Sequence, residues 1–524
     1  MQQLSGMDAS FVYLETPNTP MHIGSVAIYD PSTAPGGKVR FKDILRHIEA
    51  RLHLARPFRQ KLVRVPGNLD HPYWIEDANF DIEFHVRHIA LPEPGDWRQL
   101  CIQVARLHSR PMDMSKPLWE FTVVEGLDNI EGLPDGCFAL VSKVHHAAID
   151  GMSGVDMTSA IHSLEAEAPP PAEPATPWQA EKAPGLGELL FRTHLNNLAQ
   201  PMNWLRTVSD SLPGLARLGQ GWSKREVSFG NVKPAPRTRF NAKVGPHRAF
   251  EGADFSLGEV RAARTAVAGA TVNDVMLTVV GGALRSYLEA KGELPKESMT
   301  AMAPISVRAE GEKGAMGNLV SAMVVALGTH IADPLERLAY VHGEAENSKA
   351  MTNAVGARTL AKYSELLPSA LAGLGARLYT QLGLAARMSQ PFNCVVTNVP
   401  GPRVPIYMAG AKMVVQYGTG PIFDGMGLIH PVYSYGDKIV VSFVADRDAI
   451  PDPAVYAGCL RDSFAELKAA AEAGAAPKSR IEPSSRPAAK PAPKSATKSA
   501  PKSTTKSATK SATKSRKPAT AAAE

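Results

Sequence analysis

The sequence reads His145-His146-Ala147-Ala148-Ile149-Asp150-Gly151 directly after a mostly apolar run, Cys137 to Val144, and shortly before a helical pattern, Ser153 to Leu164. A short apolar run that follows a glycine is typical of a buried strand. Asp150-Gly151 is typical of a turn into the following helix. The seven residues are therefore expected at a junction between a strand and a helix.

Strand and helix patterns also alternate elsewhere along the chain. Apolar residues from Val275 to Leu288 recur at helical spacing and predict a long helix, whereas Leu319 to Leu327 and Ile439 to Ala445 are typical of strands. This alternation indicates an α/β or α+β fold.

The two adjacent histidines are expected to differ in role. Neighbouring side chains on an extended chain point to opposite faces, so one of His145 and His146 is expected to enter a cleft while the other packs inward. The same geometry argues against a shared metal ion. A neutral imidazole, with a pKa of about 6.5, can accept an alcohol proton at neutral pH. The pattern therefore indicates a general base, with a structural role for both histidines as the alternative.

Composition divides the chain into four parts. Six prolines between Ala166 and Gly185 predict a linker, because proline interrupts helices and sheet ladders. The following segment, Leu186 to Arg239, has helical spacing and added positive charge. It is either an amphipathic pair of helices at a membrane interface or a hairpin packed on its own protein. We expect an N-terminal lobe at residues 1–165, a linker and helical segment at 166–239, a C-terminal lobe at 240–474 and a tail at 475–524.

The positive charge belongs to the tail. The chain has a formal net charge of +6, but residues 478–524 contain twelve Lys or Arg and two Glu, which leaves −4 for residues 1–477. No large apolar residue follows Ile481, so we expect the tail to be disordered. Its charge could attract anionic lipid or, without sequence preference, nucleic acid.

The four cysteines are widely spaced and form no CxxC pair, which argues against a disulfide framework or zinc ribbon and favours a reducing compartment. No run of about 18 apolar residues predicts a membrane-spanning helix. The first residues have no apolar core typical of a secretory signal. These features predict a cytoplasmic protein.

The histidine stretch resembles the HHxxxDG motif of the bacterial wax ester synthase/diacylglycerol acyltransferases, which coenzyme A-dependent acyltransferases and peptide-synthetase condensation domains share. Further blocks resemble the first of these groups and follow its order over about residues 1–470. They are Leu4 to Ala9, Pro20 to Gly24, Pro117-Leu118-Trp119, Asn273-Asp274-Val275, Pro304 to Arg308, Gly317-Asn318 and Thr397 to Pro402.

The resemblance implies two lobes of the chloramphenicol acetyltransferase type with a tunnel between them, entered by acyl-CoA on one side and the acceptor alcohol on the other. It implies that His146 is the general base, that His145 supports it, and that no metal or further cofactor takes part. The product would be triacylglycerol from diacylglycerol, or wax esters from long-chain alcohols. Such insoluble substrates imply a protein bound peripherally to the inner face of the cell membrane or to lipid inclusions.

The supporting residues of these blocks have open roles. Asp150, beside Gly151, either caps the following helix or forms an ion pair with Arg308 that orients the loop. Asn273, beside Asp274, is either a helix cap or part of the site. Pro117, Leu118 and Trp119 are expected to pack at the lobe interface, where Trp119 could line the tunnel.

Two rival functions remain open at this point. The first is another condensation-type acyltransferase that uses carrier-bound acyl groups. The second is a lipid-granule or polyanion-binding protein with a relic acyltransferase core, which the lysine-rich tail motivates.

Overall fold

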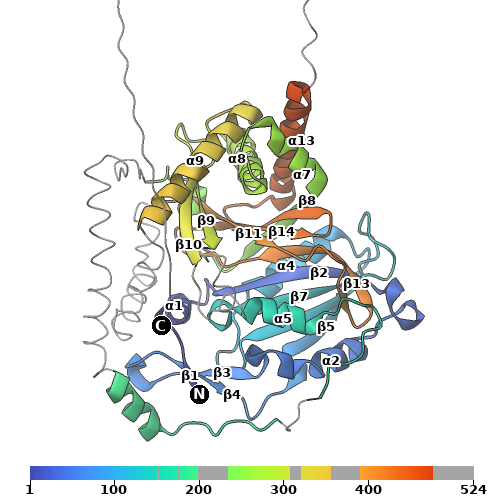
Figure 1. The fold of residues 1–524 in the computed structure, drawn as a ribbon, viewed down its shortest axis with the longest axis vertical. Helices are drawn as coiled ribbons and strands as arrows, with labels where there is room; N and C mark the ends of the chain where they lie inside the picture. The colour runs from blue at the N-terminus through green and yellow to red at the C-terminus, as the bar shows by residue number, and fades with distance from the viewer. Residues whose placement is uncertain are drawn as a thin grey trace, which may run out of the picture. The chain divides into compact units, whose positions relative to one another are not determined.

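A computed structural model describes residues 1–149, 153–173, 178–196, 198, 234–306, 320–355 and 390–475. It contains two six-stranded sheets and a smaller three-stranded sheet (Figure 1). The mixed α/β architecture predicted from the sequence is confirmed. The expected disorder of the tail concerns residues outside the described ones, and the four-part division of the chain stays a prediction.

The first sheet has the strand order β12-β13-β2-β7-β6-β5. Its strands are β2 (His22–Asp30), β5 (Val86–Ala90), β6 (Trp119–Glu125), β7 (Phe138–His145), β12 (Tyr407–Met408) and β13 (Ala411–Thr419). The central strand β7 matches the apolar run expected before the histidines. It is paired antiparallel to β2 on one side and to β6 on the other.

The second sheet has the order β10-β9-β11-β14-β15-β8. Its strands are β8 (Arg248–Ser256), β9 (Thr300–Ser306), β10 (Val320–Ala326), β11 (Cys394–Pro400), β14 (Leu428–Tyr435) and β15 (Lys438–Asp446). Strands β10 and β15 occupy the two segments expected to be strands. The three-stranded sheet consists of β1 (Gln2–Gln3), β4 (Tyr73–Glu76) and β3 (Gln60–Val63).

Helices cover the sheets. In the first half of the chain they are α1 (Gly6–Leu14), α2 (Phe41–Glu49), α3 (Ile82–His85), α4 (Trp97–Ser109) and α5 (Ser153–Ile161), and in the second half α7 (Leu257–Ala263), α8 (Val272–Ala290), α9 (Pro334–Val355) and α13 (Pro453–Ala475). The long helix expected from Val275 onward is α8. It packs between α9 and α13, which explains why nearly all of its middle is buried (Figure 1).

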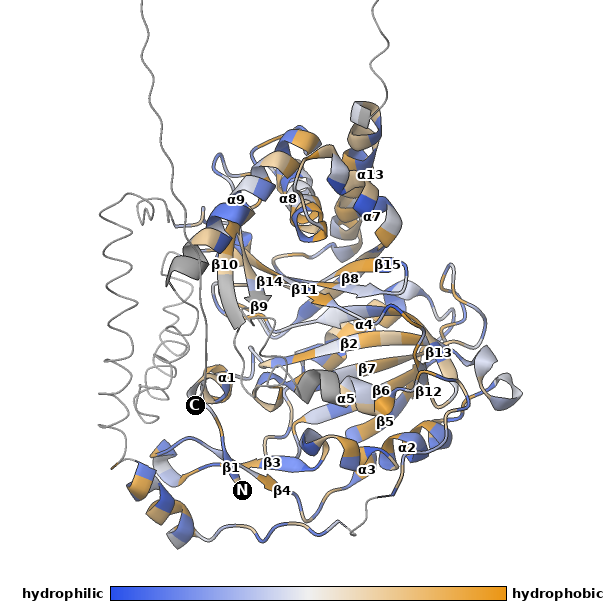
Figure 2. Cartoon of the chain, viewed as in Figure 1, coloured by the Kyte–Doolittle hydropathy of each residue, from blue (hydrophilic) through white to orange (hydrophobic). Residues whose placement is uncertain are grey.

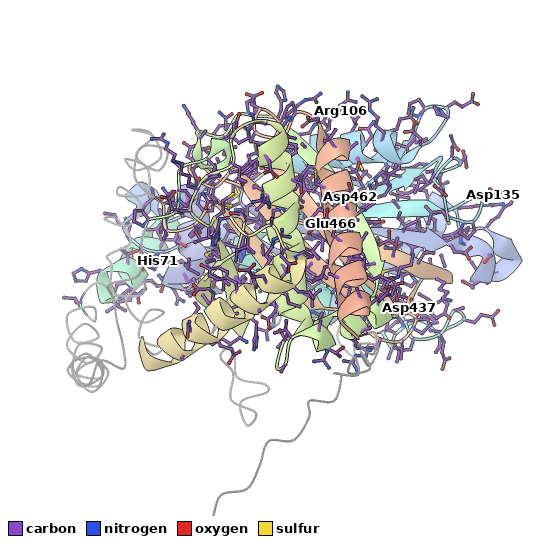
Figure 3. The ribbon with its side chains drawn as sticks, turned by 90° about the horizontal axis from the view of Figure 1, so that it is seen from above. His71, Arg106, Asp135, Asp437, Asp462 and Glu466 are labelled. Carbon is purple, nitrogen blue, oxygen red and sulfur yellow. The ribbon has the colours of Figure 1, made fainter. Side chains whose placement is uncertain are left out.

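The same three helices lie together over the second sheet when seen from above (Figure 3). Asp462 and Glu466, labelled on α13, are four residues apart and both exposed, whereas Phe464 and Leu467 are buried. This amphipathic spacing is what orients α13 on the sheet.

Strand β13 connects the two halves of the chain. Although it comes from residues assigned to the second lobe, it pairs antiparallel with β2 in the first sheet, with Thr419 opposite Gly24 and Lys412 opposite Asp30. A Cβ atom on Gly418 would lie 2.6 Å from the Pro431 side chain of β14, so a larger residue could not occupy this close approach.

An apolar core shared by both sheets lies beside this strand, and Figure 2 shows how apolar residues concentrate on the strands. Burial of such side chains is the main stabilising contribution to the association of the two sheets. The shared core includes Val26, Ile28, Val415, Phe250, Ile429 and Val444, together with Leu100 and Val104 of α4.

Within the described residues, no helix combines the length and apolar character needed to cross a bilayer.

Candidate active site

The histidine pair lies where three strands come side by side. The amide of His145 donates a 2.9 Å hydrogen bond to the carbonyl of Leu118, and the amide of His146 donates a 2.8 Å bond to the carbonyl of Met21. His22 is the register partner of His145 across β2 and β7. Three sequence blocks that are far apart in the chain therefore meet at the end of β7, because β7 is the strand between the other two.

His145 packs inward, with no exposed side-chain surface. Its Nε2 contacts the Glu15 carboxylate at 2.5 Å, and its Nδ1 accepts the amide N–H of Ala147 at 3.1 Å. Since Nδ1 is an acceptor, the ring proton must be on Nε2, which donates to Glu15. His145 is therefore held as one neutral tautomer by partners on both sides of its ring.

His146 begins a short 3-10 turn, His146–Ala148, and its ring is partly exposed. The ring stacks on Phe11, with centroids 3.8 Å apart and 12° between the planes. Nδ1 of His146 is buried and has no hydrogen-bond partner among the described residues. Nε2 of His146 is not buried to the same degree, and it also forms no hydrogen bond with the described residues.

Burial lowers the pKa of His146 to about 4, and the neighbouring His145 lowers it further. The backbone carbonyl of His146 opposes this shift, although it forms no well-aligned hydrogen bond with the ring. The imidazole is therefore neutral at neutral pH and can accept a proton.

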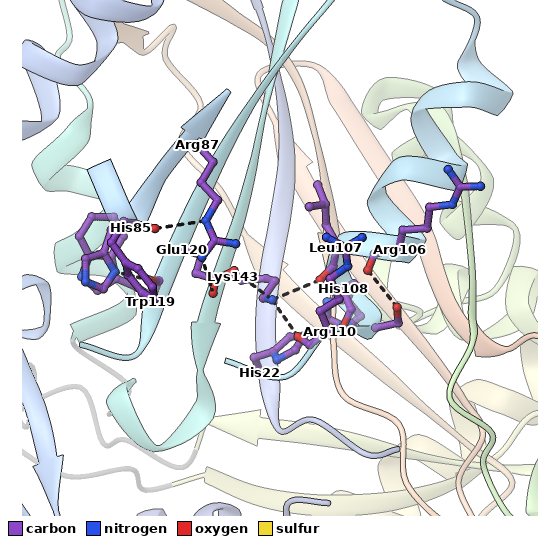
Figure 4. A network of polar contacts seen from close by, with 12 residues as sticks. His22, His85, Arg87, Arg106, Leu107, His108, Arg110, Trp119, Glu120 and Lys143 are labelled. Atoms are coloured by element: carbon purple, nitrogen blue, oxygen red, sulfur yellow. Dashed lines mark hydrogen bonds and ion pairs between the residues drawn. The ribbon is translucent and has the colours of Figure 1, made fainter. Parts of the chain in front are cut away.

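Buried polar side chains fix the strand ends that carry the pair (Figure 4). The Lys143 ammonium donates to the carbonyls of Leu107 and Arg110 at the end of α4, at 3.2 and 2.8 Å, and pairs with Glu120 at 3.2 Å. The last carbonyls of a helix have no partners within the helix and attract positive charge. Lys143 therefore joins β7 to the end of α4.

Two further histidines complete this junction. His22 Nε2 donates to the carbonyl of His108 at 2.7 Å, and His108 Nε2 donates to the carbonyl of Gly420 at 2.9 Å. Burial lowers the pKa of His108 to about 3 and lowers that of His22 well below its usual value, so both rings are neutral. In the Pro20 to Gly24 block, His22 thus anchors β2 to the rest of the fold.

The block Pro117-Leu118-Trp119 is buried in the first lobe. Trp119 Nε1 donates to the carbonyl of Phe58 at 2.9 Å, and its ring stacks on His85 with centroids 4.5 Å apart. These partners all come from the first part of the chain. The apolar core that contains Trp119 also includes Met408 and Tyr435 from the second part of the chain, so the expectation that the block packs at the interface of the lobes stays a prediction.

The Asn273-Asp274 block lies at the start of α8. Thr271 caps this helix, so the alternative that Asn273 is the cap is wrong. Asn273 Oδ1 instead accepts from Asn398 at 3.4 Å, which brings together the Asn273 block and the Thr397 to Pro402 block.

The carboxylate of Asp274 is fully buried. It accepts the Thr271 amide at 2.8 Å and pairs with His342 of α9 at 3.0 Å. These bonds join α8 to its cap and to α9, and among the described residues none of them extends to His146.

Some expected site residues lie outside the described ones. These are Asp150, Gly151, Arg308 and the Gly317-Asn318 block. The alternatives for Asp150, a helix cap or an ion pair with Arg308, therefore stay predictions. In the described parts of the chain, no cluster of three or more His, Cys, Asp or Glu side chains is arranged to hold a metal ion.

Sequence reasoning missed Phe11 and Glu15, although both touch the histidine pair. Their spacing of four residues places them on one face of a helix. That spacing is the only local signal they carry, and it does not indicate a partner some 130 positions away.

Comparison with known proteins shows the family. Residues 4–276 match the family model described as the wax ester synthase/diacylglycerol acyltransferase catalytic domain, and residues 316–468 match the WS/DGAT C-terminal domain. Two Mycobacterium tuberculosis H37Rv proteins, each named "Putative diacyglycerol O-acyltransferase", are 34% and 33% identical to the chain. The alignments cover 91% and 89% of this chain and 99% of each relative.

Solved structures agree with this assignment. The wax ester synthase/diacylglycerol acyltransferase from Marinobacter aquaeolei VT8 is similar with a TM-score of 0.64 and 27% identity, covering 90% of this chain and all of that one. The starter condensation domain of rhizomide synthetase RzmA, at 13% identity, has a TM-score of 0.51 over 90% of this chain and 94% of its own, and shows the fold alone. The fold is thus the expected two-lobed type shared with chloramphenicol acetyltransferase and condensation domains. The chain belongs to the wax ester synthase/diacylglycerol acyltransferase family and is an acyltransferase of that type.

Proposed function

We propose that the protein transfers an acyl group from acyl-CoA to the free hydroxyl of diacylglycerol, forming triacylglycerol, with His146 as the general base. The observation that carries this proposal is the His146 ring itself: neutral, stacked on Phe11, and with Nε2 free of partners among the described residues. The names of the mycobacterial relatives support diacylglycerol as the acceptor.

In the proposed reaction, Nε2 of His146 accepts the hydroxyl proton while the acceptor oxygen attacks the thioester carbonyl. A tetrahedral oxyanion forms and collapses, which breaks the carbon–sulfur bond. The departing coenzyme A sulfur takes the proton back from His146, so the products are an ester and free thiol and the base returns to its neutral form. His145 and Asp150 hold the turn and exchange no proton.

A long-chain alcohol is the second candidate acceptor, because the Marinobacter structure is described as a wax ester synthase as well as a diacylglycerol acyltransferase. To test this, the protein is incubated with radiolabelled acyl-CoA and with diacylglycerol or a long-chain alcohol as the acceptor, side by side. The labelled products, triacylglycerol and wax ester, are then separated and compared. We expect triacylglycerol as the main product and, as the control, kcat lowered by roughly 10²–10⁴ in His146→Ala. Wax ester as the main product would make the long-chain alcohol the preferred acceptor in place of diacylglycerol. Transfer only from a carrier-bound acyl donor, or no transfer at all, would contradict the proposal.

We also propose peripheral contact with a lipid surface through the helix at residues 186–196. Leu189 packs with Val65 and Tyr73, while Leu186, Leu190, Phe191 and Leu195 on the same helix are exposed. Exposed apolar side chains grouped on one anchored helix are typical of an interfacial segment. The remainder of the candidate segment, up to Arg239, lies mainly outside the described residues.

Vesicle flotation tests this contact. Replacing both Leu190 and Phe191 with Glu should weaken binding at least tenfold, because each buried apolar side chain contributes about 1.5–3 kcal/mol. Leu164→Glu, at a leucine that is more exposed than either residue but lies outside this helix, is the control. High salt or carbonate should release the wild-type protein. Retention after carbonate washing, or unchanged binding of the double variant, would contradict peripheral contact through this helix.

A further inference from the structure

One turn of α1 touches both histidines. Phe11 and Glu15 are four residues apart and therefore lie on the same helix face. Phe11 stacks on the His146 ring, and the Glu15 carboxylate binds His145 Nε2. Glu15 is the residue that ends α1, and its own amide donates to the Phe11 carbonyl at 3.2 Å, so the two side chains are held at a set spacing.

The Glu15 carboxylate selects the tautomer of His145. An ionised carboxylate only accepts hydrogen bonds, so His145 must carry its proton on Nε2. The lone pair left on Nδ1 then accepts the Ala147 amide, the bond that opens the turn beginning at His146. The opposite tautomer would place a ring N–H against the Ala147 N–H and would break this bond.

The surroundings make this selection strong. The His145 ring is fully buried and the Glu15 side chain is 13% exposed, and a hydrogen bond to a charged partner is strengthened where water is largely excluded. The loop after Glu15 is also held in place. Thr16 and Thr19 bond to each other across it, and Arg248 of β8 donates to the carbonyl of Asn18. The end of α1 is thereby tied to the second sheet as well as to the first.

We propose that Glu15 is a positioning residue for the reaction: it holds His145 in the tautomer that shapes the turn and, together with Phe11, sets the direction of His146. The proposal rests on the proposed role of His146 as the base. Glu15 itself exchanges no proton with the substrate.

Three substitutions separate this role from simple packing. Glu15→Gln keeps the size of the side chain, but its amide can donate to His145 Nε2 and stabilise the wrong tautomer. Glu15→Asp keeps the carboxylate on a shorter side chain. We expect kcat to fall about 10- to 100-fold in Glu15→Gln and less in Glu15→Asp, with the KM for acyl-CoA within about twofold of wild type in both. Glu131→Gln, at an exposed carboxylate in a loop, is the control and should leave kcat unchanged.

The order of the two Glu15 variants decides between the interpretations. A packing role would favour the isosteric glutamine, so activity of Glu15→Gln equal to or above that of Glu15→Asp would overturn the proposal. A rise in KM without loss of kcat would overturn it as well. Melting temperatures of both variants show whether any loss comes from unfolding.

A double-mutant cycle tests the route through His145. If Glu15 acts through that ring, Glu15→Gln combined with His145→Ala should lose no more kcat than His145→Ala alone. Losses that multiply would mean that Glu15 acts independently, which would contradict the proposal. His146→Ala separates the proposed role of His146 from that of Glu15. A His146→Ala enzyme with near-normal activity would refute His146 as the base. A strongly impaired His146→Ala enzyme together with a fully active Glu15→Gln enzyme would refute only the role of Glu15.

Discussion

Lowering the pH from 7 to 5 should destabilise the protein, because several buried histidines are neutral in the folded state. His47 and His162 illustrate the effect, since both bind the end of α5, the helix that follows the turn at His146. His47 Nε2 contacts the carbonyl of Ile161 at 2.9 Å, and His162 Nδ1 contacts that of Thr158 at 2.7 Å. Burial lowers the pKa of each ring to about 4.

The sign of the effect follows from proton binding. An unfolded histidine has a pKa of about 6.5, so between pH 6.5 and 4 the unfolded chain binds more protons than the folded one. Stability is then present above pH 6.5 and is lost as the pH falls toward 4. A shift from about 6.5 to about 4 corresponds to a loss of roughly 2 kcal/mol per histidine between pH 7 and pH 5. The pKa values of His22, His108, His146 and His430 are lowered in the same direction, so these rings add to the loss of stability.

The assay is the melting temperature, followed by circular dichroism and tryptophan fluorescence, at pH 7, 6 and 5. The wild-type protein should melt at progressively lower temperature. His162→Gln retains a donor and an acceptor but does not titrate, so its melting temperature should depend less steeply on pH. His194→Gln, at an exposed histidine, is the control. A wild-type melting temperature that is constant or rises toward pH 5 would refute this reasoning, as would identical pH dependence in His162→Gln.

Three further predictions concern the base, the sheet and the tail. His146→Ala should lower kcat by roughly 10²–10⁴ with the melting temperature preserved, the range usual for loss of a general base, and near-normal turnover would refute the assignment. In β2, a Cβ atom on Gly24 would lie 1.9 Å from the carbonyl oxygen of Ser142, so Gly24→Ala should abolish soluble folded protein. Gly187 has open space around it, so Gly187→Ala is the control and should fold normally. A normal yield of Gly24→Ala would contradict this packing. Deleting residues 478–524 should leave turnover on dispersed substrate nearly unchanged and should weaken binding to anionic vesicles or DNA at low salt, as measured by sedimentation; equal binding by the truncated protein would exclude an electrostatic role for the tail.

Local patterns in the sequence were sufficient for the elements around the site. The strand β7 and the helix α8 could be predicted because the spacing of apolar residues reports which faces of a segment are buried, and both segments are buried over most of their length. The histidine motif, supported by the ordered blocks around it, was sufficient for the family and therefore for the two-lobed fold. The expected difference between the two histidines is met in part: His145 ends β7 and packs inward, whereas His146 already belongs to the following turn and is only partly exposed, so strand geometry alone does not set its direction.

The partners of these elements depend on contacts between distant parts of the chain. β13 pairs with β2 across nearly 400 residues of sequence, and nothing in the alternation of either strand specifies the other as its neighbour. Likewise, Asn273 looked like a possible helix cap, but the structure gives the cap to Thr271 and leaves Asn273 facing Asn398.

The same distinction applies to the chemistry of the site. The residues by themselves left open which of the two histidines enters the site, and the resemblance to the family implied His146 as the base, which stays a prediction. Only the tertiary structure decided that His146 stacks on Phe11 and that the Glu15 carboxylate binds Nε2 of His145. The pKa of a ring and the position of its proton depend on the groups packed around it in space, and those groups come from a helix that ends 130 residues earlier in the chain.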